Sequence, residues 1–216
     1  MTEREKMSSG QLYNPTDRRL MADRLRARML ADRYNRTRAF SFLKRARIIK
    51  KLFPNGGKNA FFEPSIRTEY GYNVTFGDNF YMNFDCQLLD VAPIAIGDNV
   101  LFGPRVVVAT PCHPMLPEER RAYEHPDGFY DLEYAKPVEI GSDVWVAAGV
   151  TICGGVKIGS GSVIAAGSVV VRDIPPCVLA AGVPCKPIRE ITKKDGMFEA
   201  LGITLPEGAK RYIKDI

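Results

Sequence analysis

The chain has two contrasting hydrophobic patterns, and the longer one is a six-residue repeat. From about residue 70 onward an apolar residue recurs at every sixth position, usually followed by a small residue or a turn former. One six-residue step supplies a short strand and a tight turn, so three steps close a triangular coil with the lead side chains inside. Roughly twelve such steps predict about four stacked coils of a mainly β, parallel β-helix. The repeat is uninterrupted at Ile140, Val146, Ile152, Ile158 and Ile164.

The first 60 residues have a helical pattern instead. Helices are expected over residues 2–8, 16–34 and 41–54, the first of them opened by the capping-box pair Thr2 and Glu5. In the second helix the apolar residues follow a three- and four-residue spacing, which predicts a buried face. That face comprises Leu20, Met21, Leu25, Met29, Leu30 and Tyr34.

Three segments follow from these patterns: a helical segment over 1–60, a β-helix over 61–190 and a tail over 191–216. The β-helix is interrupted by a long loop over 110–137, which is expected to be structureless and functional. In the tail, a single long helix is disfavoured by Gly196, Gly202, Pro206 and Gly208.

Composition excludes several classes of protein. The chain has 216 residues, 45% hydrophobic and 25% charged, which is typical of one globular domain with appendages. It contains no apolar run of membrane-spanning length and begins without the apolar stretch of a secretory signal, so we expect a cytoplasmic protein without a membrane partner. The five cysteines are scattered and never in CxxC spacing, which disfavours both a disulfide framework and a zinc knuckle.

The net charge of +5 is unevenly distributed. Residues 17–51 contain 13 basic and 3 acidic side chains. A basic block can indicate nucleic acid, but the helical period of this block places its charges on the outer faces of amphipathic helices. We therefore expect no nucleic-acid partner, also because few aromatic side chains are available to stack on bases.

Both histidines of the chain, His113 and His125, lie in the long loop. A histidine has a reference pKa near 6.5, which suits a general base at neutral pH. From the residues alone His113 is a candidate base, or else a loop histidine bonded to a backbone carbonyl.

Several motifs together resemble the maltose and galactoside O-acetyltransferase family of hexapeptide-repeat acyltransferases. The resemblance covers residues 2–192, although the 118–131 stretch is longer than in the maltose enzymes and the tail has no counterpart. Its motifs are the helical leader from Gln11 to Asn35, Asn79–Asp85, Thr110–Pro114, Asp143–Val146 and Ala181–Arg189.

The resemblance implies a left-handed β-helix and transfer of acetyl from acetyl-CoA to a sugar hydroxyl of the maltose, glucose or galactoside type. It implies His113 as general base in a direct ternary complex, and Asn83 at the acceptor and acetyl site. The backbone N–H of Ala148 corresponds to the oxyanion donor, although this position is also an ordinary corner of the prism.

The remaining site residues are also carried over from the family. They are Trp145, Ala166, Val171, Lys186 and Arg189 for the cofactor, with Asn14, Asp17, Glu69, Asp90 and Glu133 for the acceptor. The acids fit exposed coil corners equally well, and Trp145 fits a packing role. The family also implies a homotrimer with sites between subunits and no metal requirement.

Other readings stay open. A zinc hydrolase on the same fold needs three histidine ligands, and this chain has two histidines in total. Covalent transfer through Cys112 is disfavoured because neighbouring side chains diverge in extended backbone. A different hydroxyl acceptor, such as a drug, or a non-catalytic scaffold would each fit the repeat.

Overall fold

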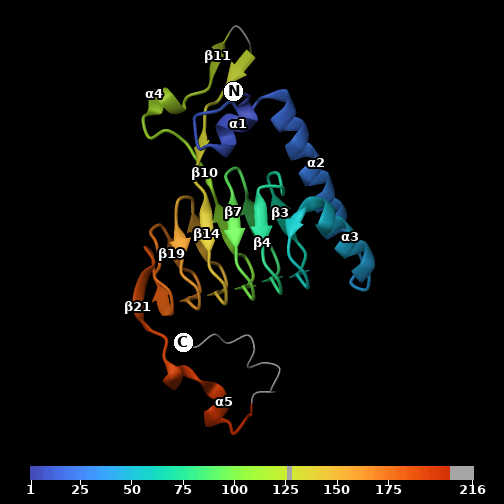
Figure 1. The fold of residues 1–216 in the computed structure, drawn as a ribbon. Helices are drawn as coiled ribbons and strands as arrows, with labels where there is room; N and C mark the ends of the chain where they lie inside the picture. Colours follow the sequence, from blue (N-terminus) through green and yellow to red (C-terminus); the bar gives the residue numbers. More distant parts are fainter. Residues whose placement is uncertain (126–127, 205–216) are drawn as a thin grey trace.

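The computed structural model describes residues 1–125 and 128–204, which contain three sheets wound into a parallel β-solenoid of about six turns (Figure 1). Sheet I contains β1 (Asn55–Gly56), β4 (Val74–Phe76), β7 (Ile94–Ile96), β14 (Val138–Ile140) and β17 (Lys157–Ile158). Sheet II contains β2 (Phe61–Phe62), β5 (Tyr81–Met82), β8 (Leu101–Phe102), β15 (Trp145–Val146), β18 (Val163–Ile164), β20 (Val178–Ala181) and β21 (Lys186–Glu190). Sheet III contains β3 (Ile66–Thr68), β6 (Cys86–Leu89), β9 (Val107–Ala109), β16 (Thr151–Cys153) and β19 (Val169–Val170). The predicted parallel β-helix is confirmed.

The prediction of about four coils is too low. The strands begin at Asn55, well before the six-residue repeat is visible, and the early coils are longer than the later ones. Asn55 pairs with Thr75 and Val74 with Ile94, each 20 positions apart, whereas Trp145 pairs with Val163, 18 positions apart. The two extra residues per early coil break the six-residue repeat without breaking the stack.

The core is the interior of the prism. The lead residues of the repeat are buried, and the first coils are filled by aromatic rings in mutual contact. Phe80, for example, lies edge-on against Phe102 with ring centroids 5.1 Å apart and against Phe62 at 5.6 Å. Such rings bury more apolar area than the valines that fill the later coils.

The leader forms α1 (Glu3–Ser8), α2 (Arg18–Asn35) and α3 (Phe42–Leu52). The helices α2 and α3 lie at the end of the solenoid formed by the first coil, whereas α1 lies beside the inserted loop and contacts β13 (Tyr134–Ala135) (Figure 1). The predicted capping box between Thr2 and Glu5 is present, and Asp17 caps α2.

The predicted buried face of α2 is wrong at three residues. Met21, Leu25 and Met29 are more than half exposed, and the buried stripe is instead Leu20, Ala27, Ala31 and Tyr34. The small alanine side chains let the helix pack closely against its neighbour, so these positions are buried. The prediction favoured the larger apolar residues because they are more hydrophobic than alanine.

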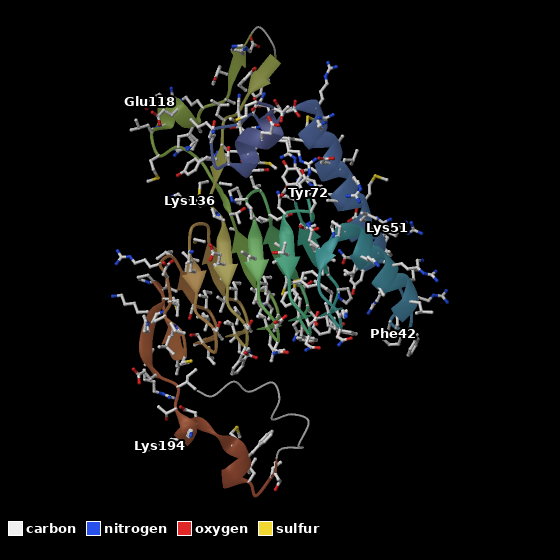
Figure 2. All side chains as sticks on the ribbon, in the orientation of Figure 1. Phe42, Lys51, Tyr72, Glu118, Lys136 and Lys194 are labelled. Carbon is white, nitrogen blue, oxygen red and sulfur yellow. The ribbon has the colours of Figure 1, made fainter. Side chains whose placement is uncertain are left out.

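The long loop is largely ordered, contrary to expectation. β10 (Pro111–Cys112) pairs antiparallel with β13 (Tyr134–Ala135), α4 (Pro117–Arg120) follows, and β11 (Tyr123–His125) pairs with β12 (Gly128–Tyr130). These elements rise from the solenoid beside α1 (Figure 1), with Lys136 at their base (Figure 2).

The tail contains η1 (Lys193–Asp195) and α5 (Met197–Ala200). No long helix occurs among its described residues, as expected. Pro206 and Gly208, which supported that expectation, lie outside the described residues.

Candidate active site

His113 directly follows β10, and the pairing of β10 with β13 places it opposite Glu133. Cys112 pairs with Tyr134 in this antiparallel pair, so His113, one residue later, lies opposite Glu133, one residue earlier. The Nε2 atom of His113 lies 3.8 Å from Oε2 of Glu133. The imidazole is 47% exposed and the carboxylate only 13% exposed. The histidine can therefore meet a ligand while its acidic neighbour is shielded from water.

Glu133 is held from its other side by Tyr13. The Tyr13 hydroxyl donates a hydrogen bond to Oε1, and the two backbones exchange N–H to carbonyl hydrogen bonds of 3.0 and 3.2 Å. Burial raises the pKa of Glu133, while the Tyr13 hydrogen bond and the nearby His113 lower it. Burial also raises the pKa of Tyr13, so its phenol remains protonated and donates. Tyr13, Glu133 and His113 thus form a chain from the leader to the open surface.

Asn14 and Asp17 line a cavity of about 480 Å³ between the leader and the β11–β12 hairpin. Oδ1 of Asn14 accepts from the backbone N and the hydroxyl of Thr16 at 3.1 and 2.8 Å. Asp17 accepts from the first backbone N–H groups of α2. Both side chains therefore stabilise the local backbone conformation, and both also line this polar cavity.

Glu69 and Asp90, which the resemblance assigns to the acceptor, both have partners within the chain. Glu69 lies 3.3 Å from Arg28 in an ion pair, and Asp90 has no exposed surface. Asp90 accepts hydrogen bonds from the Thr68 hydroxyl at 2.6 Å and from the Tyr70 backbone at 2.9 Å. It organises the extra residues that lengthen the early coils. The Asp90 carboxylate is therefore enclosed in this structure.

Three of the predicted cofactor and catalytic residues lie in one column. Asn83, Ala148 and Ala166 occupy the corner between sheets II and III in different coils, as the hydrogen bonds from Gly103 to Val146 and from Gly167 to Ala148 show. Among the described residues the N–H groups of Ala148 and Ala166 have no hydrogen-bond acceptor.

The side chains around this column are available on the surface. The carbonyl oxygen of the Asn83 side chain accepts from Phe84 N at 2.7 Å, which leaves its amide nitrogen free to donate. Trp145, on the adjoining strand β15, is 51% exposed. Val171, which is 45% exposed, directly follows β19 and lies at the other end of sheet III, not at the column. The column therefore presents free backbone donors beside an exposed aromatic side chain.

The column and His113 lie at different corners of the prism. The loop with His113 leaves between sheets III and I, after β9, whereas the column lies before sheet III. A side of about five extended residues separates them, roughly 15 Å. Within one chain the predicted base and the predicted oxyanion donor are not brought together.

Arg189 is already paired in this structure. Its guanidinium contacts both carboxylate oxygens of Asp195 at 2.9 and 2.6 Å, and this pairing lowers the pKa of Asp195 to about 2. Lys186 lies exposed at the start of the same strand, β21. Asp195 was not identified from the sequence, although the spacing from Thr192 to Asp195 is a capping-box signal, which the structure contains.

The described ranges, residues 1–125 and 128–204, contain neither a metal-ligand cluster nor a membrane-spanning helix. No group of three or more histidine, cysteine, aspartate or glutamate side chains there is arranged to hold a metal ion. No helix in this part of the chain is long and apolar enough to cross a bilayer.

Comparison with known proteins identifies the family. Residues 6–57 match the maltose acetyltransferase hexapeptide capping motif, and residues 137–172 match the bacterial transferase hexapeptide (six repeats). Galactoside O-acetyltransferase of Escherichia coli (strain K12) is 40% identical over 195 residues, covering 90% of this chain and 91% of that protein.

Two solved structures agree with this assignment. A maltose O-acetyltransferase from Clostridium difficile 630 superimposes with a TM-score of 0.83 at 42% identity, covering 89% of this chain and 99% of that one. A galactoside acetyltransferase in complex with coenzyme A gives 0.82 at 40% identity, covering 90% and 94%. The chain belongs to the hexapeptide-repeat acetyltransferases of the maltose and galactoside type, and is an acetyl-CoA-dependent O-acetyltransferase.

Proposed function

We propose that the protein transfers acetyl from acetyl-CoA to a sugar hydroxyl, with His113 as the general base in a direct ternary complex. The observation that carries this proposal is the half-exposed His113 imidazole beside the shielded Glu133 carboxylate. The imidazole takes the proton of the hydroxyl as its oxygen attacks the thioester carbonyl, and the proton passes to the departing CoA thiolate. General base catalysis of this kind contributes about 10²–10⁴-fold.

Glu133 is the positioning residue for this base. An acid beside an imidazole fixes the orientation of the ring and stabilises the cation that forms when the proton is taken. The Tyr13 hydrogen bond fixes the carboxylate in turn. In this proposal Glu133 acts through His113, and the acceptor contact expected for it from the resemblance stays a prediction.

The second half of the site is the column of Asn83, Ala148 and Ala166. The unpaired N–H of Ala148 is suited to donate to the developing oxyanion, an interaction whose loss typically costs about 10²–10³-fold. The free amide nitrogen of Asn83 is suited to hold the acceptor or the thioester oxygen.

The predicted cofactor residues also present exposed groups. Trp145 and Val171 offer exposed apolar surface for the pantetheine arm, and Lys186 and Arg189 offer positive charge for the phosphates.

A second copy of the chain completes the site. Because His113 and the column lie at different corners of one prism, the base of one subunit meets the column of its neighbour when prisms pack side by side. A triangular prism repeats this contact around a three-fold axis, and the ring then closes as a homotrimer.

The acceptor is a sugar of the maltose, glucose or galactoside type. Support comes from the names of the relatives, maltose and galactoside O-acetyltransferase, and from the cavity with Asn14 and Asp17. Side-chain amides and carboxylates are the groups that bind sugar hydroxyls.

The test is His113→Ala assayed by thiol release from acetyl-CoA with maltose, glucose and a thiogalactoside as acceptors. We expect at least a hundredfold loss in kcat with nearly unchanged CoA affinity, because the base acts only in the chemical step. His125→Ala, in the hairpin of the same loop, is the matched control and is expected to stay within about threefold of the parent. Near-normal turnover by His113→Ala contradicts the assignment of the base, and silence of every acceptor with intact CoA binding contradicts the sugar acceptor.

A further inference from the structure

A second cavity lies at the opposite end of the molecule from the CoA-phosphate residues, between α3 and the first coil. Its volume is about 630 Å³, within the range of roughly 300–1,000 Å³ that small-molecule sites occupy. One wall is a single face of α3, from Phe42 through Arg45 to Ile49, and Phe53 directly after the helix continues it. The other wall is the segment from Pro54 to Phe62 at the start of the solenoid. Figure 2 shows Phe42 at the free end of α3.

Aromatic rings make up most of the apolar lining. Phe53 stacks on Phe62 with ring centroids 5.5 Å apart, and both contact Phe76. Phe61 and Phe42 are at the rim, and each is more than 40% exposed. The cavity therefore has a closed apolar floor and an open apolar edge.

The charged groups of the lining are mainly cationic. Arg45, Lys50 and Lys58 line the cavity, and Asp78 is the one carboxylate among the lining residues. Asp78 is already engaged, because its Oδ1 accepts from the backbone N of Lys58 at 2.7 Å. The lining thus has an excess of two positive charges.

Arg45 is the decisive group because it is 91% buried yet lacks an anion. Its residue exposure is 9%, its Nε donates to the Thr37 hydroxyl at 2.8 Å, and its guanidinium lies 5.6 Å from the Tyr34 ring centroid. Within residues 1–125 and 128–204 no carboxylate forms an ion pair with it. A buried guanidinium without a charged partner is costly, and its fork geometry fits a carboxylate bidentately.

We infer that this cavity binds an amphiphilic carboxylate, with the head group on Arg45 and the apolar body against the phenylalanine floor. Lys50 and Lys58 add positive charge to the lining. The site is separate from the acetyl-transfer residues and does not depend on the proposed function.

The experiment is calorimetric titration of the full-length protein with decanoate and with 2-naphthoate, which separate an alkyl from an aromatic body. We expect one saturable site per chain for at least one of these probes, with an affinity that saturating acetyl-CoA leaves unchanged. Decanol, which has the same chain without the charge, is expected to bind at least tenfold more weakly.

Matched variants locate the site. Arg45→Met keeps an apolar stem and is expected to weaken binding at least tenfold, whereas Arg47→Met, exposed on the same helix and outside the cavity, is expected to leave it unchanged. Ala46→Trp fills the cavity from an exposed position and is expected to abolish binding, which keeps the test decisive if Arg45→Met fails to fold. Unaltered binding in Ala46→Trp, equal weakening in Arg47→Met, or the absence of saturable binding by both probes overturns the inference.

Discussion

The contact between Tyr13 and Glu133 gives a quantitative prediction, since it ties the leader to the loop that contains His113 through one side-chain hydrogen bond. Tyr13→Phe retains the buried ring and removes only the hydroxyl that donates to Glu133. Hydrogen bonds to charged groups contribute about 1.5–3 kcal/mol, and removing the donor leaves a largely buried carboxylate with one partner fewer. Glu133 is 13% exposed, so water replaces part of the interaction, and we expect a loss of about 1–2 kcal/mol in the free energy of unfolding.

For a chain of this length, 1 kcal/mol corresponds to about 2–4 °C in Tm. We therefore expect Tyr13→Phe to unfold about 2–8 °C below the parent when followed by circular dichroism. The same variant is expected to lose activity by up to about tenfold in kcat, equivalent to about 1.4 kcal/mol, because the carboxylate that positions His113 becomes less fixed.

A double-mutant cycle separates positioning from general destabilisation. Glu133→Gln alone removes the negative charge beside His113. In the double variant no carboxylate is present, so Tyr13→Phe has no further effect on the positioning of His113. We expect the two effects on kcat to be non-additive by about 0.5–1.5 kcal/mol. Additive effects on kcat, or a loss of Tm in Tyr13→Phe with fully parental turnover, would refute the positioning role.

The remaining predictions concern Asp90 and Arg189. Burial raises the pKa of Asp90 from 3.8 to about 6, so the folded state holds more protons than the unfolded state between these values, and this group's contribution to stability falls as the pH rises through that window. Asp90→Asn is expected to destabilise the fold by about 1–3 kcal/mol through its lost hydrogen bonds and to flatten the dependence of Tm on pH between 4 and 6; an unchanged pH slope contradicts this. Asp195→Asn frees Arg189 from its carboxylate partner and is expected to tighten CoA binding by up to about fivefold, leaving dephospho-CoA unaffected in the same titration. Glu190→Gln is the matched control, and equal changes for both ligands contradict a contact between Arg189 and phosphate.

Much of the architecture follows from local patterns. The lead residues of the repeat, such as Ile140 and Ile158, specify inward-facing positions that only stacked coils can bury. Asp17 and the Thr2–Glu5 pair fix where helices begin, because a capping side chain satisfies backbone N–H groups a few residues away. Local patterns fail where the coil length changes, as at the enclosed Asp90, because two extra residues per coil displace the apolar positions from the six-residue spacing.

The sequence by itself therefore determined the solenoid and its helical leader, since both depend on residues that are near in the chain or repeated along it. It also determined the family, because the family motifs are short stretches of sequence. Only the tertiary structure decided which distant groups meet: Glu133 with Tyr13 across 120 positions, Arg189 with Asp195, and the column of Asn83, Ala148 and Ala166 on one corner. These contacts depend on strand register and on how the loop folds back, and no periodic pattern in the sequence encodes either of them. The separation of His113 from that column is the clearest case, because it follows from the corner at which the loop leaves the prism.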